Sequence, residues 1–233
     1  MNFQDRHVVV TGGAGALGAA VLDALLRSGA WCHVPLRSAQ SVERSALRGN
    51  PRASLDVVGD LADEAAVSRY YDGLEDLWAS IHIAGSFAGA PIARSDESVL
   101  RNQLESNLVS AYVCSRAAVA SMRKRKTGGR IVNVAARQAL EPRLGSGSVA
   151  YTISKAGVAA LTTALGAELA GEGILVNAVA PSIMDTPANR KDMPDADFAS
   201  WPKVEEVAAA ILFLASPVNV VTRGAVVPVY GKA

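Results

Sequence analysis

The chain has 233 residues, half of them hydrophobic, which is enough for one α/β domain with a full core. Lysine and arginine total 23 and aspartate and glutamate 22, so this near-neutral balance gives no reason to expect nucleic acid or an anionic membrane as partner. No apolar run reaches the length of a membrane span, no secretion signal is recognisable, and the two cysteines, Cys32 and Cys114, have no metal-ligand spacing. We therefore expect a cytoplasmic protein with buried free thiols.

Short β-branched runs alternate with longer helical patterns along nearly the whole chain. We predict strands at His7–Val10, Trp31–Leu36, Leu55–Val58, Trp78–Ala84, Arg130–Val134, Leu175–Ala180 and Ala225–Val229, and helices at Ala16–Ser28, Asp63–Leu74, Glu97–Arg123, Ala150–Ala170 and Val204–Ala215. Such alternation requires crossover connections, so it predicts one doubly wound (Rossmann) domain over residues 1–233, with a parallel seven-stranded sheet and helices on both faces. The irregular residues 182–202, which hold three prolines, are predicted to form a substrate lid.

The first predicted strand leads into a glycine-rich segment. Gly13, Gly15 and Gly18 fit the pattern G-x-G-x-x-G, which gains meaning from this strand-turn-helix context. Glycine permits positive φ and lets a pyrophosphate approach the free N–H groups of the helix. The alternative is a glycine-rich turn that holds no ligand. We expect dinucleotide binding by Thr11, Gly12, Gly13, Gly15, Ala16, Leu17 and Gly18.

The end of the second strand bears on which dinucleotide binds. An acidic residue there takes the ribose 2′-hydroxyl of NAD, whereas an arginine accommodates the 2′-phosphate of NADP. The sequence has no carboxylate at this point and reads Arg37-Ser38, which offers charge-assisted hydrogen bonds to a phosphate. Arg37 could instead be an ordinary solvated loop residue. The pattern favours NADP(H) over NAD(H).

A candidate acid/base pair lies in the predicted helix at residues 150–170. Tyr151 and Lys155 stand four residues apart, so both side chains face the same side of the helix. An adjacent ammonium favours the phenolate, and we expect it to lower the tyrosine pKa toward the working range. The pair could then exchange the proton that accompanies hydride transfer. On its own, Tyr-x-x-x-Lys is more often a chance surface pair.

The sequence resembles the short-chain dehydrogenase/reductases from Thr11-Gly12 to the glycines at 224 and 231. Further matching positions are Asp60-Leu61, Ala84-Gly85, Asn107 and Pro181 with Thr186, each after a predicted strand or in the following helix. By this resemblance, Asp60 and Leu61 would hold the adenine and Tyr151 would be the general acid/base. Lys155 would bind the nicotinamide ribose and, with Asn107, relay protons through water. Cofactor contacts at Ala84, Gly85, Pro181 and Thr186 are likewise implied.

Several positions depart from the family pattern. Ala16 stands where the second glycine is usual, and His82-Ile83 replaces a pair of asparagines. Ala136 stands where the catalytic serine, which ordinarily hydrogen-bonds the substrate carbonyl, is expected. Without a replacement donor, carbonyl reduction should slow by the few kcal/mol associated with one lost oxyanion donor. Ser146 and Ser148 precede Tyr151, but the sequence does not settle where their hydroxyls lie.

Two segments resemble the dihydropteridine reductase branch of this family. They are His82–Gly89, with its aromatic Phe87, and the lid stretch Asp185–Trp201. Those enzymes keep the tyrosine and lysine without the serine, which a conjugated quinonoid pterin tolerates chemically. They also typically have an acid at the position of Arg37 and use NADH, so the likeness could mark only a shared lid. Trp201 would either cap the substrate pocket or pack the lid onto the core.

These observations predict an NAD(P)H-dependent oxidoreductase that acts on a small carbonyl, quinonoid or pterin-like substrate. The alternative is an NADP(H)-binding sensor or scaffold protein that has lost turnover, because fold alone does not guarantee activity. The family resemblance also implies a homodimer or homotetramer built on the helices predicted at 97–123 and 150–170. His7, His33 and His82 lie in three separate strand regions without ligand spacing, so we expect no metal site.

Overall fold

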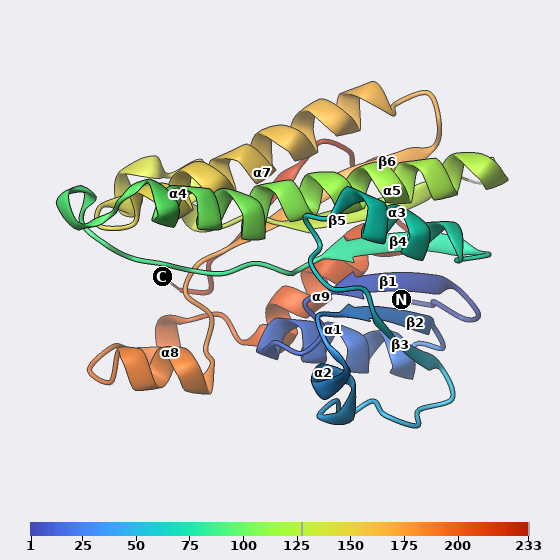
Figure 1. Cartoon of the computed structure of the whole chain (residues 1–233), viewed down its shortest axis with the longest axis horizontal. Helices are drawn as coiled ribbons and strands as arrows, with labels where there is room; N and C mark the ends of the chain where they lie inside the picture. Colours follow the sequence, from blue (N-terminus) through green and yellow to red (C-terminus); the bar gives the residue numbers. More distant parts are fainter. Residues whose placement is uncertain (127, 233) are drawn as a thin grey trace.

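Seven parallel strands form the centre of the computed structural model, which describes residues 1–126 and 128–232 (Figure 1). Their order across the sheet is β3-β2-β1-β4-β5-β6-β7. The bounds are β1 His7–Thr11, β2 Trp31–Leu36, β3 Ala53–Val57, β4 Leu77–His82, β5 Gly129–Val134, β6 Ile174–Pro181 and β7 Val226–Val229. Every residue of β5 and β6 is buried, as expected for central strands covered on both faces.

Helices cover both faces of the sheet. On one face, α1 (Ala16–Arg27) packs against α9 (Val204–Ala215). On the other face lie α3 (Glu64–Asp72), α4 (Glu97–Gln103), α5 (Ser110–Arg125) and α7 (Val149–Glu168) (Figure 1). The predicted fold class and all seven predicted strands are confirmed. Among the described residues, no helix is long and apolar enough to cross a membrane.

The long helix predicted at Glu97–Arg123 is interrupted. A π-helical segment at Leu104–Val109, labelled η2, separates α4 from α5. It carries Asn107, whose Nδ2 donates to the carbonyl oxygen of Gln103 at 3.1 Å. Hydrophobic periodicity could not show this change of winding, because the apolar stripe continues on both sides of it. Such π segments are frequent at functional sites.

Short elements at the loop ends were not predicted. They are α2 (Ala39–Glu43), α6 (Arg137–Leu140), α8 (Pro187–Asp192) and the 3-10 turns η1 (Ile92–Arg94), η3 (Pro142–Gly145) and η4 (Phe198–Ser200). Each is six residues or fewer, too short for a periodic signal. Figure 1 shows α8 at the end of the sheet where the strands have their carboxyl ends.

The strand order reverses between β1 and β4, which is the position where open α/β sheets bind ligands. Three polar residues lie in register across this edge. Thr11 of β1 stands opposite His82 of β4, and His82 stands opposite Asn133 of β5. The glycine-rich segment follows β1 directly, so it faces this crevice.

Candidate active site

The glycine-rich segment forms a tight connection between β1 and α1. Gly12 has a φ of +72°, and a Cβ there would lie 2.7 Å from the backbone nitrogen of Ala84. A Cβ on Gly18 would lie 2.2 Å from the carbonyl oxygen of Gly12, and one on Gly13 would strike core side chains. Gly15 differs, since its Cβ would meet only the Gly12 oxygen, at 3.4 Å. Packing therefore explains three of these glycines but not Gly15.

The amino end of α1 is open. Gly15 is its N-cap, no side chain caps the helix, and its first turn holds no acidic residue. Ala16 is exposed, while Leu17 is buried in the core. Free N–H groups and the positive end of the helix dipole at this point suit an anion.

Thr11 is committed to holding two strands together. Its side chain is buried, and its Oγ1 accepts hydrogen bonds from the backbone nitrogens of Ile83 at 3.1 Å and Ala84 at 3.2 Å. The hydroxyl thereby joins the end of β1 to the segment that follows β4. A direct contact of Thr11 with a cofactor stays a prediction.

Arg37 and Asp60 meet beyond the ends of β2 and β3. Their side chains are 80% and 61% exposed, and the guanidinium lies 3.8 Å from the carboxylate. A surface pair at this distance contributes little stability, so both groups are available to a ligand. Ser38 caps α2 by accepting a hydrogen bond from the backbone nitrogen of Ser41. Leu61 is half-buried beside them.

Asn107 lies beside the segment that follows β4. Its Oδ1 accepts from the backbone nitrogen of Ser86 at 3.1 Å, and its Nδ2 donates to the Ser86 oxygen and to Ser154 Oγ. A Cβ on Gly85 would lie 2.3 Å from Asn107 Oδ1 and 3.5 Å from Lys155 Nζ. The structure therefore brings Asn107, Gly85 and Lys155 together.

Tyr151 and Lys155 share one face of α7. Lys155 is buried, its Nζ donates to the carbonyl oxygen of Val134 at 2.8 Å, and this nitrogen lies 5.9 Å from the Tyr151 ring centroid. Burial lowers the pKa of Lys155 to about 8. Burial raises the pKa of Tyr151 to about 12, so the expected lowering of the tyrosine pKa is wrong for the unliganded protein. The desolvation of Tyr151 outweighs the effect of the Lys155 ammonium, because that ammonium donates its hydrogen bond to the backbone carbonyl of Val134.

The two serines that precede α7 differ in burial, and Ala136 has no hydroxyl of its own. Ala136 is buried at the start of α6, and Ser146 is exposed in the loop before α7. Ser148 is buried just before α7, and its Oγ donates to the Gly145 oxygen at 3.3 Å. The hydroxyl proton of Ser148 is therefore already donated to the Gly145 carbonyl.

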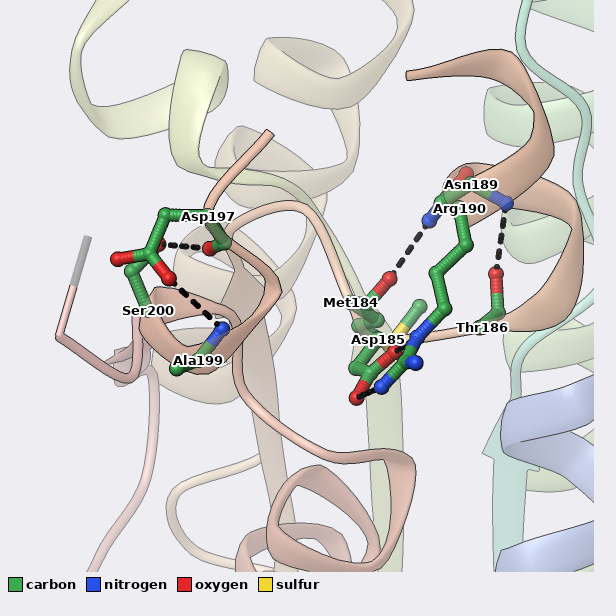
Figure 2. Close-up of polar contacts among 8 residues, drawn as sticks. All are labelled: Met184, Asp185, Thr186, Asn189, Arg190, Asp197, Ala199 and Ser200. Carbon is green, nitrogen blue, oxygen red and sulfur yellow. Dashed lines mark hydrogen bonds and ion pairs between the residues drawn. The ribbon is translucent and has the colours of Figure 1, made fainter. Parts of the chain in front are cut away.

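The two ends of the predicted lid, residues 182–202, are hydrogen-bonded to each other. The backbone nitrogen of Asp185 donates to the Pro202 oxygen at 2.9 Å, which closes the segment. Figure 2 shows Thr186 capping α8 through the backbone nitrogen of Asn189, while the Asn189 side chain donates to the Met184 oxygen. Arg190 forms two hydrogen bonds with the Asp185 carboxylate, at 2.6 and 2.8 Å. These contacts give the segment a defined shape.

The segment lines an open pocket of about 880 Å³ together with Glu206 of α9 and Val229 of β7. Phe198 contacts Arg190 through a cation–π interaction and lies 5.1 Å from the Trp201 ring. Trp201 is buried, which agrees with a role in packing the lid onto the core. Pro181, at the end of β6, is also buried, and it places this segment beside β7.

Phe87 was not singled out for the site. Its ring lies 4.9 Å from the Tyr151 ring in an edge-to-face arrangement, although 66% of the residue is exposed. A large exposed aromatic beside a half-buried phenol offers an apolar surface to a ligand. Its place in a loop gave no periodic signal, so only the three-dimensional contact identifies it.

The cysteines and histidines are placed as follows. Cys32 and Cys114 are buried and free, as expected, and burial raises both thiol pKa values to about 12. His7 and His33 lie in different strands, as predicted, but β1 and β2 are neighbours, so the two rings lie 5.1 Å apart. Among residues 1–126 and 128–232, no three potential ligands cluster around a metal position.

Comparison with known proteins agrees with this architecture. A strand, a glycine-rich connection and an uncapped helix at the switch point define the class of dinucleotide-binding domains. A family model described as short chain dehydrogenase matches residues 6–197. The chain therefore belongs to the short-chain dehydrogenase family of oxidoreductases.

Individual relatives match over nearly their full lengths. The chain is 35% identical to a galactitol 2-dehydrogenase of Rhizobium johnstonii, covering 98% of this chain and 97% of that protein. It is 34% identical to a cis-4-hydroxycyclohexanecarboxylate dehydrogenase of Sinomonas cyclohexanicum, with 98% and 96% covered. A structure described as ElxO with NADP bound shares the fold, with a TM-score of 0.88 at 23% identity and 98% of both chains covered.

Proposed function

We propose that the protein transfers a hydride between NADP(H) and the carbinol or carbonyl carbon of a small secondary alcohol or ketone. The observation that carries the proposal is the convergence of Asn107 and Lys155 on Gly85, next to the residue that packs against Gly12, with Tyr151 on the same face of α7 as Lys155. The named dehydrogenases among the relatives, which include those for galactitol and cis-4-hydroxycyclohexanecarboxylate, favour a hydroxylated substrate.

The residues of this chain fit the cofactor. Gly15 leaves room for a pyrophosphate where a Cβ would stand, and the first turn of α1 has free N–H groups with no acid to repel it. Exposed Arg37, with Ser38, would hold a 2′-phosphate, while Asp60 and Leu61 would border the adenine. Support for NADP(H) also comes from the bound NADP named in the ElxO structure.

When bound, the nicotinamide would supply the hydride that forms the new C–H bond at the substrate carbon. Tyr151 Oη would give its proton to the substrate oxygen, and the resulting phenolate would be stabilised by the ammonium of Lys155. Asn107 would hold the water that returns a proton through Lys155. Because burial keeps the pKa of Tyr151 near 12, the phenol is protonated at neutral pH and favours reduction in that range.

The substrate half of the site is less specific. Phe87 offers an apolar ring edge next to Tyr151, and Ala136 offers no hydroxyl. A pterin-like or quinonoid substrate rests on the sequence likeness of residues 82–89 and 185–201 alone. The relatives named above favour hydroxylated substrates instead. We also propose that residues 182–202 act as the lid.

The test is single-turnover oxidation of bound NADPH by matched acceptors. The panel contains a ketohexose, 4-oxocyclohexanecarboxylate and quinonoid dihydropterin, with Tyr151→Phe as the mechanistic variant. We expect oxidation by one of the first two and a loss of about 10²-fold or more in Tyr151→Phe. Tight NADPH binding without oxidation by any acceptor would favour the sensor alternative. A fully active Tyr151→Phe protein would reject the role of the phenol.

We further propose that the chain forms a dimer or tetramer through α5 and α7. A groove of about 650 Å³ between these helices is lined by Tyr112, Leu161 and Ala164, and Tyr112 and Ile153 are exposed. Light scattering should give a mass above that of one chain for the wild type and a smaller mass for Ile153→Glu. A monomeric wild type at micromolar concentration would reject this assembly.

A further inference from the structure

A network of hydrogen-bonded, buried polar side chains runs along one face of the sheet, from α3 across β4 and β5 to α7. Tyr71 Oη lies 2.8 Å from Ser80 Oγ, and Ser80 Oγ lies 2.8 Å from His82 Nε2. His82 Nδ1 lies 2.8 Å from Asn133 Oδ1, and Asn133 Nδ2 donates to Thr162 Oγ1 at 3.0 Å. All five residues are buried. This hydrogen-bonded network thus joins α3, β4, β5 and α7 through side chains alone.

The direction of these hydrogen bonds is fixed from the α7 end. Thr162 Oγ1 donates to the Val158 oxygen at 2.8 Å, so it must accept from the amide nitrogen of Asn133. Asn133 Oδ1 then accepts, which assigns the imidazole proton of His82 to Nδ1. His82 Nε2 is left to accept from Ser80, and Ser80 accepts from Tyr71.

With His82 neutral and its proton on Nδ1, every member of this network has a hydrogen-bond partner. A weaker contact of Ser115 Oγ with Nδ1, at 3.4 Å, is compatible with this assignment. Burial agrees, because it lowers the pKa of His82 to about 4. A fully satisfied buried network favours one unique arrangement of the elements that it joins.

The α7 end of the network reaches the helix that carries the candidate acid/base pair. Thr162 lies seven residues, two turns, after Lys155, so both side chains are on the same face of α7. Lys155 bonds the oxygen of Val134, and Thr162 bonds the side chain of Asn133, the preceding residue of β5. Hydrogen bonds therefore attach α7 to β5 at two places, which are two turns apart along the helix.

The other neighbours of His82 belong to the cofactor side. It stands opposite Thr11, whose hydroxyl holds the two residues that follow His82. The next residue, Gly85, packs against Asn107. His82 consequently lies between the glycine-rich segment and the strand that anchors α7.

We propose that His82 is a positioning residue which, through Asn133 and Thr162, sets the location of Tyr151 and Lys155 relative to the glycine-rich segment. Its kinetic consequence rests on the function proposed above. The far end of the network supplies an internal control, because Tyr71 belongs to α3 and contacts neither the glycine-rich segment nor α7 through the bonds described. A purely stabilising network would make both ends equivalent for catalysis.

The experiment compares His82→Leu, His82→Gln and Thr162→Val with Tyr71→Phe. We would measure kcat, KM, the Kd of NADPH by fluorescence and the thermal midpoint, with kinetics taken at a temperature where each protein is folded. Tyr71→Phe should lower the thermal midpoint and leave kcat within about twofold of wild type. His82→Leu and Thr162→Val should lower kcat about tenfold, with partial recovery in His82→Gln, whose amide replaces one of the two imidazole contacts.

Two outcomes would overturn the positioning role. One is a folded His82→Leu protein whose kcat stays within twofold of wild type although its thermal midpoint falls. If His82→Leu does not fold, the same result in Thr162→Val is decisive. A wild type that binds NADPH without turnover would instead reject the proposed function. In that case the positioning role is tested by the Kd of NADPH, which should rise in Thr162→Val and not in Tyr71→Phe. The second overturning outcome is a Kd in Thr162→Val that equals the wild-type value.

Discussion

The two halves of the carboxyl edge of the sheet are built in different ways. Around β1 and β2, backbone geometry determines the site, because a positive φ at Gly12 and the close approach of Gly18 to Gly12 leave little freedom. Around β5, β6 and β7, side chains and short elements determine it, namely Ala136, α6 and the segment closed by Asp185 and Pro202. The first half follows from a short motif, whereas the second depends on contacts between residues far apart in the chain.

The largest expected effect is that of replacing Lys155, which should lower activity and raise stability. Lys155→Met should reduce turnover by about 10² to 10⁴, because it removes the charge next to the phenol. It should also raise the free energy of unfolding at pH 7 by about 1–3 kcal/mol, because wild type buries an ammonium whose pKa falls to about 8. Activity assays and denaturant unfolding measure the two effects.

The pH dependence of that gain has a definite sign. Between about pH 8 and the ordinary lysine range, the unfolded chain binds a proton that the folded chain has released, so wild-type stability rises with pH. The advantage of Lys155→Met should therefore be complete below pH 8 and disappear near pH 10.5. Exposed Lys203→Met is the control and should change neither quantity. A less stable Lys155→Met protein at pH 7 would contradict the burial argument.

The cofactor half can be tested at the one glycine that packing does not explain. Gly15→Ala places a methyl group in van der Waals contact with the Gly12 oxygen alone, at 3.4 Å, so the thermal midpoint should change little. The same methyl group would stand between a pyrophosphate and α1, so the Kd of NADPH should rise by roughly 10- to 100-fold, as expected for overpacking of about 1–3 kcal/mol. Binding is measured by NADPH fluorescence.

Gly171→Ala is the control, because Gly171 has no atom within 4 Å of its ideal Cβ and, like Gly15, no positive φ. It should leave the NADPH Kd unchanged. Equal affinity in Gly15→Ala and wild type would show that no ligand approaches this helix end.

The features that the sequence predicts are those that depend on short stretches of chain, as in the cofactor half of the site. Trp31–Leu36 and Val204–Ala215 are predicted to the residue, because a short, largely apolar stretch and a 3.6-residue period are local signals. The sequence also brings Tyr151 and Lys155 together, since helical spacing alone determines that they share a face. These features depend on residues close in the chain.

The remaining features depend on burial and on distant partners. The pKa of Tyr151 is governed by desolvation, which a four-residue spacing does not report. The hydrogen-bonded network of Ser80 and His82 could not be predicted, because it depends on Asn133 of β5, which lies opposite His82 in the folded sheet. The same holds for Phe87, whose contact with Tyr151 joins residues 64 positions apart in the chain.

The smallest expected effect concerns the choice between the two dinucleotides, where a side chain rather than the backbone acts in the cofactor half. Arg37 is 80% exposed and only loosely paired with Asp60, so its removal should cost no measurable stability. Arg37→Ala should weaken NADPH binding by about tenfold, the worth of one charge-assisted hydrogen bond in part-exposed surroundings, and leave NADH binding unchanged. Arg48→Ala, an exposed arginine outside the site, controls for net charge. If Arg37→Ala weakens both dinucleotides equally, the arginine acts only through its general charge and does not read the 2′-phosphate; if it weakens neither, the preference for NADP(H) must come from another residue at the ends of β2 and β3.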